Sequence, residues 1–326
     1  MADAIAALMR ERPLLLDGGL GTQILARKPT VDDFGGSAFE GCMEILCERR
    51  PDWIREIHAA YLDAGADAVE TNSFGANAAV LADYGLAPRA EELNALAASL
   101  ARDVAQSYDR PRFVVGSVGP GSKLVSLGQI DPDTLFSAYR AQVRGLLAGG
   151  ADAILVETCQ DPGQIKAALR AAKATMAESG TRRPLWVQAT VEPSGTLLLG
   201  TEIQAVLALV RALGADLLGL NCGTGPSEMR APLAALAEAS PLLLSCQPNA
   251  GLPIHQGGAL VYPLDPESFA EQVASLAERF GLDLVGGCCG TTPDHIRALA
   301  SRLPGLHPLR RHPRPEPAVS SLYQAV

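Results

Sequence analysis

Three features that are missing from this sequence narrow its function. No uninterrupted apolar run approaches the roughly 18–20 residues that span a bilayer, which argues against a membrane protein. Basic residues are too few for a nucleic-acid partner, because 27 Lys and Arg stand against 36 Asp and Glu and the net charge is −9. The start, "MADAIAALMRERP", lacks a basic segment and a cleavage site, so it predicts a short helix and no signal peptide.

Nucleotide-binding glycine motifs are missing as well. "GGLGTQI" has no third glycine at the dinucleotide-binding position, and "GSVGPGSK" has the wrong residue order for a phosphate-binding Walker loop. The seven cysteines are an odd number in a sequence without an export signal. This indicates reduced thiols and a cytoplasmic protein.

Eight short apolar runs alternate with amphipathic helical segments, such as those at 51–65, 131–150 and 265–281. Nearly continuous apolar strands, each followed by a helix, predict a parallel sheet covered by helices. Eight repeats favour a single-domain α/β fold, the closed (β/α)₈ TIM barrel, over an open doubly wound sheet. The runs are at 13–17, 67–71, 113–119, 152–158, 185–191, 216–222, 242–248 and 282–289.

The chain divides at about residue 303. We expect residues 1–303 to form the barrel. Residues 304–326 are rich in Pro and Arg and have no helical or strand period, which predicts a linker or tail. One interpretation is that this tail leads to a further domain absent from the sequence, and the other is an ordinary frayed terminus.

Polar and thiol residues follow the predicted strands, at the end of a barrel where functional side chains lie. The candidates are Asp17, Gly18, Gly19, Glu70, Asn72, Glu157, Asn221, Cys222, Asn249, Cys288 and Cys289.

The adjacent cysteines Cys288 and Cys289 stand out among these residues. Neighbouring side chains of a strand point to opposite faces, so both can serve one site only where the strand ends and the backbone turns. The flanking glycines permit such a turn. Cys222 ends the sixth strand, which is one strand away from the eighth. Three converging thiolates with an open fourth position are typical of a catalytic zinc.

Other interpretations of the thiols and carboxylates stay open. Cys288 and Cys289 could form a vicinal disulfide, or all three cysteines could be packing residues. A barrel aldolase or lyase with Glu70 or Glu157 as base would leave the cysteines unexplained and has no convincing Schiff-base lysine. We expect the remaining cysteines to be buried structural residues: Cys42, Cys47, Cys159 and Cys246.

Six motifs resemble, in order, those of the homocysteine S-methyltransferase family: "LLLDGGLGTQI", "GADAVETNSFGAN", "GADAILVETCQD", "GLNCGTGP", "PNAGLP" and "VGGCCGTTPDHI". The resemblance spans about residues 13–304. Within the family, the chain is similar to the N-terminal homocysteine-binding barrels of cobalamin-dependent methionine synthases. The resemblance implies a methyltransferase with one zinc per chain on Cys222, Cys288 and Cys289, which activates L-homocysteine as a thiolate for S-methylation in methionine biosynthesis.

An amino-acid substrate also needs groups for its ammonium and carboxylate. Asp17 and Glu157 are candidates for the ammonium, and the resemblance supports both. The turn that contains Gly18, Gly19 and Thr22 offers backbone N–H groups to the carboxylate.

The remaining candidates have less defined roles. Glu70 and Asn72 could contact substrate or brace the rim, and Asn221 lies at the same rim. We expect the amide oxygen of Asn249 to occupy the fourth zinc position until substrate displaces it. His58 and His295 are most simply surface or capping residues, and His255 has no assigned role.

The methyl donor is not specified by the sequence. A cobalamin-binding D-x-H-x-x-G motif is missing, because Pro253 stands where the Asp would precede His255. The resemblance and the tail favour methylcobalamin on another domain or chain of a methionine synthase, which would also carry a folate module. The alternatives are a stand-alone enzyme that uses S-methylmethionine, S-adenosylmethionine or betaine, and a non-catalytic zinc module that binds a thiol amino acid.

Overall fold

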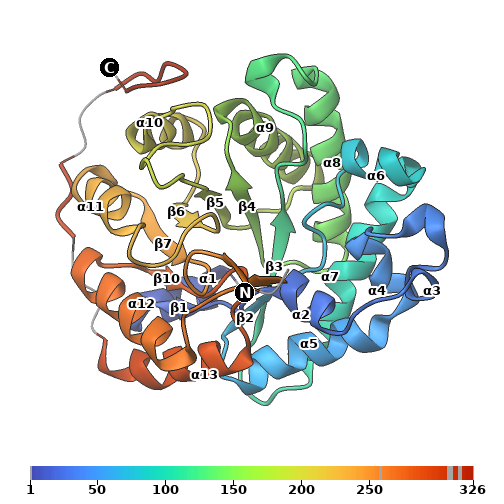
Figure 1. Cartoon of the computed structure of the whole chain (residues 1–326). Coiled ribbons are helices and arrows are strands. Elements are labelled where there is room, and N and C mark those ends of the chain that lie inside the picture. Colours follow the sequence, from blue (N-terminus) through green and yellow to red (C-terminus); the bar gives the residue numbers. More distant parts are fainter. Residues whose placement is uncertain (1, 257–258, 307–310, 315–317, 326) are drawn as a thin grey trace.

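The computed structural model describes residues 2–256, 259–306, 311–314 and 318–325. Its main sheet curls into a barrel surrounded by helices (Figure 1). All its ladder pairs are parallel, in the order β1-β10-β7-β6-β5-β4-β3-β2, which confirms the predicted TIM barrel. The strands are β1 (Leu14–Leu15), β2 (Ala68–Glu70), β3 (Phe113–Val118), β4 (Ala153–Cys159), β5 (Leu185–Ala189), β6 (Leu217–Asn221), β7 (Leu243–Gln247) and β10 (Leu284–Val285).

The barrel closes at β1 and β2 through two aspartates: Asp67 before β2, and Asp17 after β1, whose Oδ2 accepts the backbone N–H of Glu70. Among the described residues, no strand pairing joins β1 to β2. Instead, Asp67 N donates to Leu15 O at 2.7 Å, and Asp67 Oδ2 accepts from Leu15 N at 3.0 Å. Arg12 pairs with the same carboxylate at 2.7 Å. A side chain therefore takes the place of a ladder bond at this seam.

The same device recurs before three other strands. In each case an aspartate just before one strand accepts the backbone N–H of the neighbouring strand, which fixes the register where the strands begin. The pairs are Asp152 with Val114 N, Asp216 with Leu185 N, and Asp283 with Leu244 N.

Helices cover the outside of the barrel, and five of the eight long ones begin at a Pro, a position where its missing N–H costs nothing. The long helices are α5 (Pro51–Asp63), α7 (Ala90–Gln106), α8 (Pro132–Ala148), α9 (Pro162–Ser179), α10 (Ile203–Ala212), α11 (Arg230–Ala239), α12 (Pro266–Phe280) and α13 (Pro293–Arg302). Shorter helices are α2 (Leu20–Ala26), α3 (Val31–Phe34), α4 (Leu46–Arg49) and α6 (Ala78–Leu81). None of the helices that the structure describes is long and apolar enough to span a membrane.

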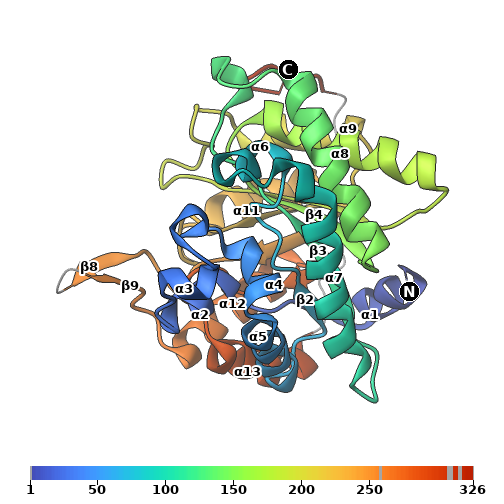
Figure 2. The same cartoon turned by 90° about the vertical axis from the view of Figure 1, so that its right-hand side faces the viewer.

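The barrel interior is apolar at one end and polar at the other. The predicted N-terminal helix, α1 (Ala2–Glu11), covers the end where the strands begin and contributes Ile5 and Met9 to an apolar cluster. At the opposite end the interior side chains are polar and buried, including Ser117, Glu157 and Gln188. The hairpin of β8 (Ile254–Gln256) and β9 (Ala259–Val261), which the sequence analysis did not predict, projects from the side of the molecule away from α1 (Figure 2).

The structure agrees with the prediction for one of two histidines and contradicts it for the other. His295 belongs to the capping box of α13 with Thr292, in agreement with a capping role. The expectation for His58 was wrong, because it is fully buried on α5. It lies one helical turn from Ile54 and Leu62 and so extends the apolar face. Neither ring nitrogen has a hydrogen-bond partner.

Burial of His58 predicts an acid-labile contribution to stability. Burial lowers its pKa to about 4. Below the ordinary value of about 6.5, the unfolded chain therefore binds a proton that the folded chain refuses, and stability falls as the pH falls. This should cost about 2 kcal/mol between pH 7 and pH 5.

Chemical denaturation at both pH values measures this effect. His58→Leu should lose less stability on acidification than the wild type, and the exposed control His255→Gln should match the wild type. Equal pH dependence in His58→Leu and wild type would show that His58 does not resist protonation.

The described tail residues contact the barrel at several places. Arg311 donates to Ser240 O at 2.9 Å and Leu242 O at 2.8 Å, near the start of β7. Further on, Glu202 N, before α10, donates to Tyr323 O at 2.8 Å. The described tail residues therefore lie along the outer wall (Figure 1). The division at residue 303 and the linker role stay predictions.

Candidate metal and amino-acid site

Three cysteines meet at the C-terminal end of the barrel. Cys222 follows β6 with φ +57, a strained conformation for a non-glycine residue. Its sulfur lies 3.8 Å from that of Cys289, and the sulfurs of Cys222, Cys288 and Cys289 all lie within 4.8 Å of one another. Zn–S bonds of about 2.3 Å at tetrahedral angles also place sulfurs about 3.8 Å apart. The donor set and spacing fit a tetrahedral zinc.

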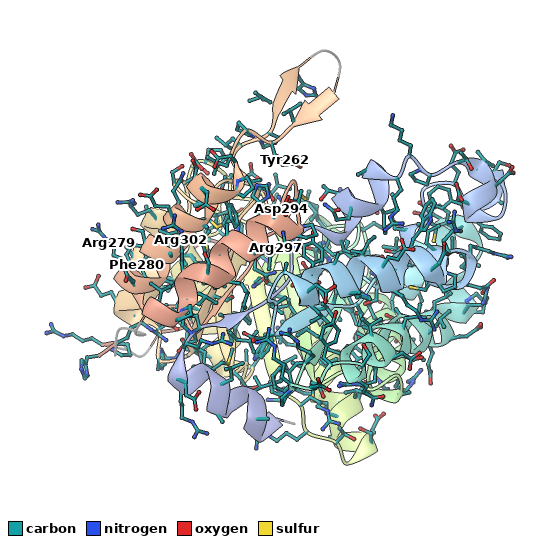
Figure 3. All side chains as sticks on the ribbon, turned by 90° about the horizontal axis from the view of Figure 1, so that it is seen from below. Tyr262, Arg279, Phe280, Asp294, Arg297 and Arg302 are labelled. Carbon is teal, nitrogen blue, oxygen red and sulfur yellow. The ribbon has the colours of Figure 1, made fainter. Side chains whose placement is uncertain are left out.

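The turn after β10 brings the adjacent cysteines to the site. Of its three glycines only Gly290 uses the left-handed region, with φ +78, and the ring of Tyr262 packs against it. Gly286 and Gly287 serve close packing instead, since a Cβ on Gly287 would lie 2.5 Å from Thr291 Oγ1. Tyr262 lies at the base of the β8–β9 hairpin (Figure 3).

The three thiols share their protons unequally. Hydrogen bonds from Cys222 and Cys288 lower the pKa of Cys289 to about 3. The pKa of Cys288 rises, because it donates to Cys222 and Cys289 and is buried. Cys289 is therefore the cysteine of the cluster whose thiolate form the neighbouring thiols favour. Ionisation of all three in so small a space requires a cation between them.

Asn249 lies beside the cluster. Its Oδ1 accepts the backbone N–H of Cys289 at 3.0 Å, so the amide positions this cysteine. The expectation that the same oxygen fills the fourth zinc position stays a prediction.

Three carboxyl groups form the second part of the site: the buried Asp17 and Glu157, and the half-buried Glu70. Asp17, after β1, accepts the backbone N–H of Glu70 at 3.0 Å through Oδ2, whereas its buried Oδ1 has no partner. Glu157, in β4, accepts from Ser117 Oγ at 2.5 Å and from Asn221 Nδ2 at 3.1 Å.

The electrostatics of these carboxyls favour a cation. Burial raises the pKa of Glu157 to about 7. Burial also raises the pKa of Asp17 and of Glu70, and repulsion by Glu157 adds to both shifts. No Lys, Arg or His is among the described residues that line the adjoining cavity. An ammonium group would supply the missing positive charge.

A cavity of about 240 Å³ joins the cysteines to Glu70 and Glu157, whereas Asp17 lies directly before the lining residue Gly18 and is not itself among the described lining residues. Its wall includes the turn from Gly18 to Thr22 and side chains of Glu70, Glu157 and all three cysteines, with Leu20, Met43 and Phe74 as apolar lining. A small molecule in this cavity can reach sulfur at one end and carboxylate at the other.

Some groups of the glycine-rich turn from Gly18 to Thr22 already make hydrogen bonds within the protein. Gly19 N donates to Thr291 Oγ1 at 3.0 Å, and Thr22 Oγ1 donates to Gly19 O at 2.8 Å. The turn leads into α2, whose first amides, from Leu20 to Thr22, have no acceptor within the helix. These amides, and not that of Gly19, are the available donors for a ligand carboxylate.

Asn72 and Asn221 brace the rim. Asn72 lines the cavity, but its Nδ2 donates to Met43 O at 2.8 Å. Asn221 Oδ1 accepts from Thr158 N at 2.9 Å, while its Nδ2 holds Glu157.

Sequence reasoning missed three residues around the site: Ser117, which donates to Glu157; Gln247, which donates to Glu70; and Thr291, which links the turns after β1 and β10. Ser117 interrupts an apolar run, and Gln247 ends another, which was the available signal. The remaining cysteines, at 42, 47, 159 and 246, are buried as expected.

Comparison with known proteins bears on what such a site does. The family model described as homocysteine S-methyltransferase matches residues 14–303. The chain belongs to this family. It is 47% identical over 322 residues to the methionine synthase of Mycobacterium tuberculosis, and the match covers 98% of the chain but 27% of that protein. The Mycobacterium leprae methionine synthase is also 47% identical, with the same coverage. The chain thus spans about a quarter of the length of these relatives.

Among solved structures, the homocysteine methyltransferase MmuM from Escherichia coli matches nearly end to end. Its metallated form is 27% identical, has a TM-score of 0.73, and is covered to 98% by 91% of this chain. Its oxidized form gives a TM-score of 0.71 with 96% and 89% coverage. The homocysteine S-methyltransferase barrel is therefore the fold of this chain.

Proposed function

We propose that this chain binds L-homocysteine and activates it as a thiolate on zinc for S-methylation to methionine. The observation that carries the proposal is the cluster of three cysteine sulfurs within 4.8 Å of one another. These cysteines line a cavity that Glu70 and Glu157 also line. The thiol and ammonium of a small amino acid match these two ends.

In this proposal Cys222, Cys288 and Cys289 hold the zinc, and Asn249 positions Cys289. The metal would bind the substrate sulfur as a thiolate at neutral pH, where a free thiol with a pKa near 8.5 is mostly protonated. Because the three ligands are anionic, the substrate sulfur keeps its electron density and stays nucleophilic. The reduced thiols that the site needs agree with the cytoplasmic location expected from the sequence.

The same proposal assigns the substrate ammonium to the carboxyls. Asp17 Oδ1 lacks a partner, and Glu157 is held in place by Ser117 and Asn221. The substrate carboxylate faces the first amides of α2, where the helix dipole also favours an anion.

The methyl group, we propose, comes from methylcobalamin on another domain or chain of a methionine synthase. Support comes from the identity of 47% to methionine synthases, of which the chain spans 27%. The second candidate is a stand-alone enzyme that uses S-methylmethionine, S-adenosylmethionine or betaine. It is supported by the near-complete overlap with MmuM.

Zinc analysis of the purified chain, followed by calorimetric titration with L-homocysteine at several pH values, tests the proposal. We expect about one zinc per chain and binding that releases a proton. A metal-free protein that ignores homocysteine, even after zinc is added under reducing conditions, would overturn it. Turnover with methylcobalamin or with S-methylmethionine as the added donor then separates the two candidates.

A further inference from the structure

A chain of buried side chains runs across the barrel interior beneath the cavity. Gln188, in β5, donates through Nε2 to Ser245 Oγ at 3.0 Å and to Gln247 Oε1 at 2.6 Å. Gln247, at the end of β7, donates through Nε2 to Glu70 Oε1 at 2.9 Å. Gln188, Ser245 and Gln247 are at most 2% exposed. We call these three residues the glutamine relay.

A glycine between the two strands makes the relay possible. β6 lies between β5 and β7 in the sheet, and its Gly219 is level with both Gln188 and Ser245. A Cβ at Gly219 would lie 1.9 Å from Ser245 Oγ. The missing side chain lets residues of β5 and β7 meet across β6.

The relay points its donors toward Glu70. Nε2 of Gln247 lies near two acceptors, Glu70 Oε1 at 2.9 Å and Gly287 O at 3.5 Å, so the amide nitrogen belongs on this side. The amide oxygen then faces Gln188, which supplies the donor. Oε1 of Gln188 is buried without a partner, which costs free energy.

The donor aimed at Glu70 fixes the position of its carboxyl group, and it opposes the burial and the repulsion that raise the pKa of this group. Glu70 is also the residue whose backbone N–H holds Asp17, and its side chain lines the cavity. Glu70 therefore both lines the cavity and fixes the position of the neighbouring Asp17.

We propose that Gln247, oriented by Gln188, is a positioning residue that holds the Glu70 side chain as a third carboxyl group for the substrate's ammonium group. The cavity thereby selects thiols that carry an α-ammonium over thiols that lack one. This inference rests on the proposed function, since it takes homocysteine as the ligand.

Two ligands separate recognition of the ammonium from recognition of the thiol. L-homocysteine and 4-mercaptobutanoate share the thiol, the chain length and the carboxylate, but only the first carries an ammonium. Each is titrated into zinc-loaded wild type, Gln247→Met and the control Gln164→Met. Gln164 is a buried glutamine of α9 that donates to Lys123 O at 2.9 Å, away from the relay.

We expect Gln247→Met to raise the Kd for L-homocysteine about 5- to 20-fold and to leave the Kd for 4-mercaptobutanoate within about twofold, with zinc content unchanged. Gln164→Met should leave the ratio of the two Kd values as in the wild type. Gln188→Met removes the donor to Gln247 and should shift that ratio in the same direction. It keeps the test available if Gln247→Met does not fold.

Three results would overturn the inference. The first is an equal loss for both ligands, or for neither, in both relay variants. The second is a wild type that binds 4-mercaptobutanoate as tightly as L-homocysteine. The third is a zinc-loaded wild type that binds neither ligand, which would remove the proposed function itself.

Discussion

A Cys289→Ala protein is expected to lose its zinc while the barrel stays folded. Only two thiolate ligands remain after this change, and the Cys222–Cys289 contact of 3.8 Å disappears. Zinc affinity should fall by more than about 100-fold. Loss of a residue that only hydrogen-bonds to a metal ligand already costs up to about 100-fold, and here a ligand itself is lost. Homocysteine binding should become undetectable. Metal analysis, calorimetry and circular dichroism on one preparation measure all three quantities.

Cys246→Ala is the matched control for this change. Cys246 is buried in β7, where its sulfur contacts that of Met229 at 3.5 Å, outside the cluster. The control should keep about one zinc per chain. Stoichiometric zinc in Cys289→Ala would show that the metal assignment is wrong.

A Glu157→Gln protein should retain zinc but bind homocysteine about 30- to 150-fold more weakly. The change keeps the shape of the side chain and removes a charge-assisted hydrogen bond to the ammonium, worth about 2–3 kcal/mol. Asp17→Asn should have an effect of the same size, because Oδ1 of Asp17 lacks a protein partner. Calorimetric titration of the zinc-loaded variants gives the Kd values.

Glu192→Gln provides the comparison. Glu192 follows β5 at the same end of the barrel, but it pairs with Gln160 at 3.1 Å and does not line the cavity. It should bind homocysteine as the wild type does. Unchanged affinity in Glu157→Gln and Asp17→Asn would contradict the assignment of these carboxylates to the ammonium.

The barrel could be predicted because its signals are local. Apolar runs alternate with amphipathic segments, and those with a Pro at their start form the helices α5, α8 and α12 close to the predicted ranges. The strand lengths could not be predicted. The run at 282–289 yields only Leu284–Val285 as strand, since the glycines after it pack against neighbouring turns.

Site residues could be predicted from the sequence where their position at the end of a strand was enough to place them in the site. Barrel closure brings Cys222 and Cys289 together, and the rule that strand ends carry function found both. Contacts across strands depend on register, which the sequence does not specify, so Gln247 and its bond to Glu70 were missed. His58 was misjudged because the buried face of α5 is one residue wider than its apolar residues suggest.

The strands that support the pocket differ in length, and among the described residues no strand pairing joins β1 to β2. Glu157 lies in β4 and Cys222 directly follows β6, strands of seven and five residues inside continuous ladders. Asp17, Cys288 and Cys289 follow β1 and β10, with two residues each. An amino acid bound at its sulfur and its ammonium would connect the residues on the long strands to those that follow the short strands. Under the proposed function, substrate binding therefore stabilises the barrel against unfolding. The bound substrate adds contacts near β1 and β10, which have the fewest backbone hydrogen bonds of their own.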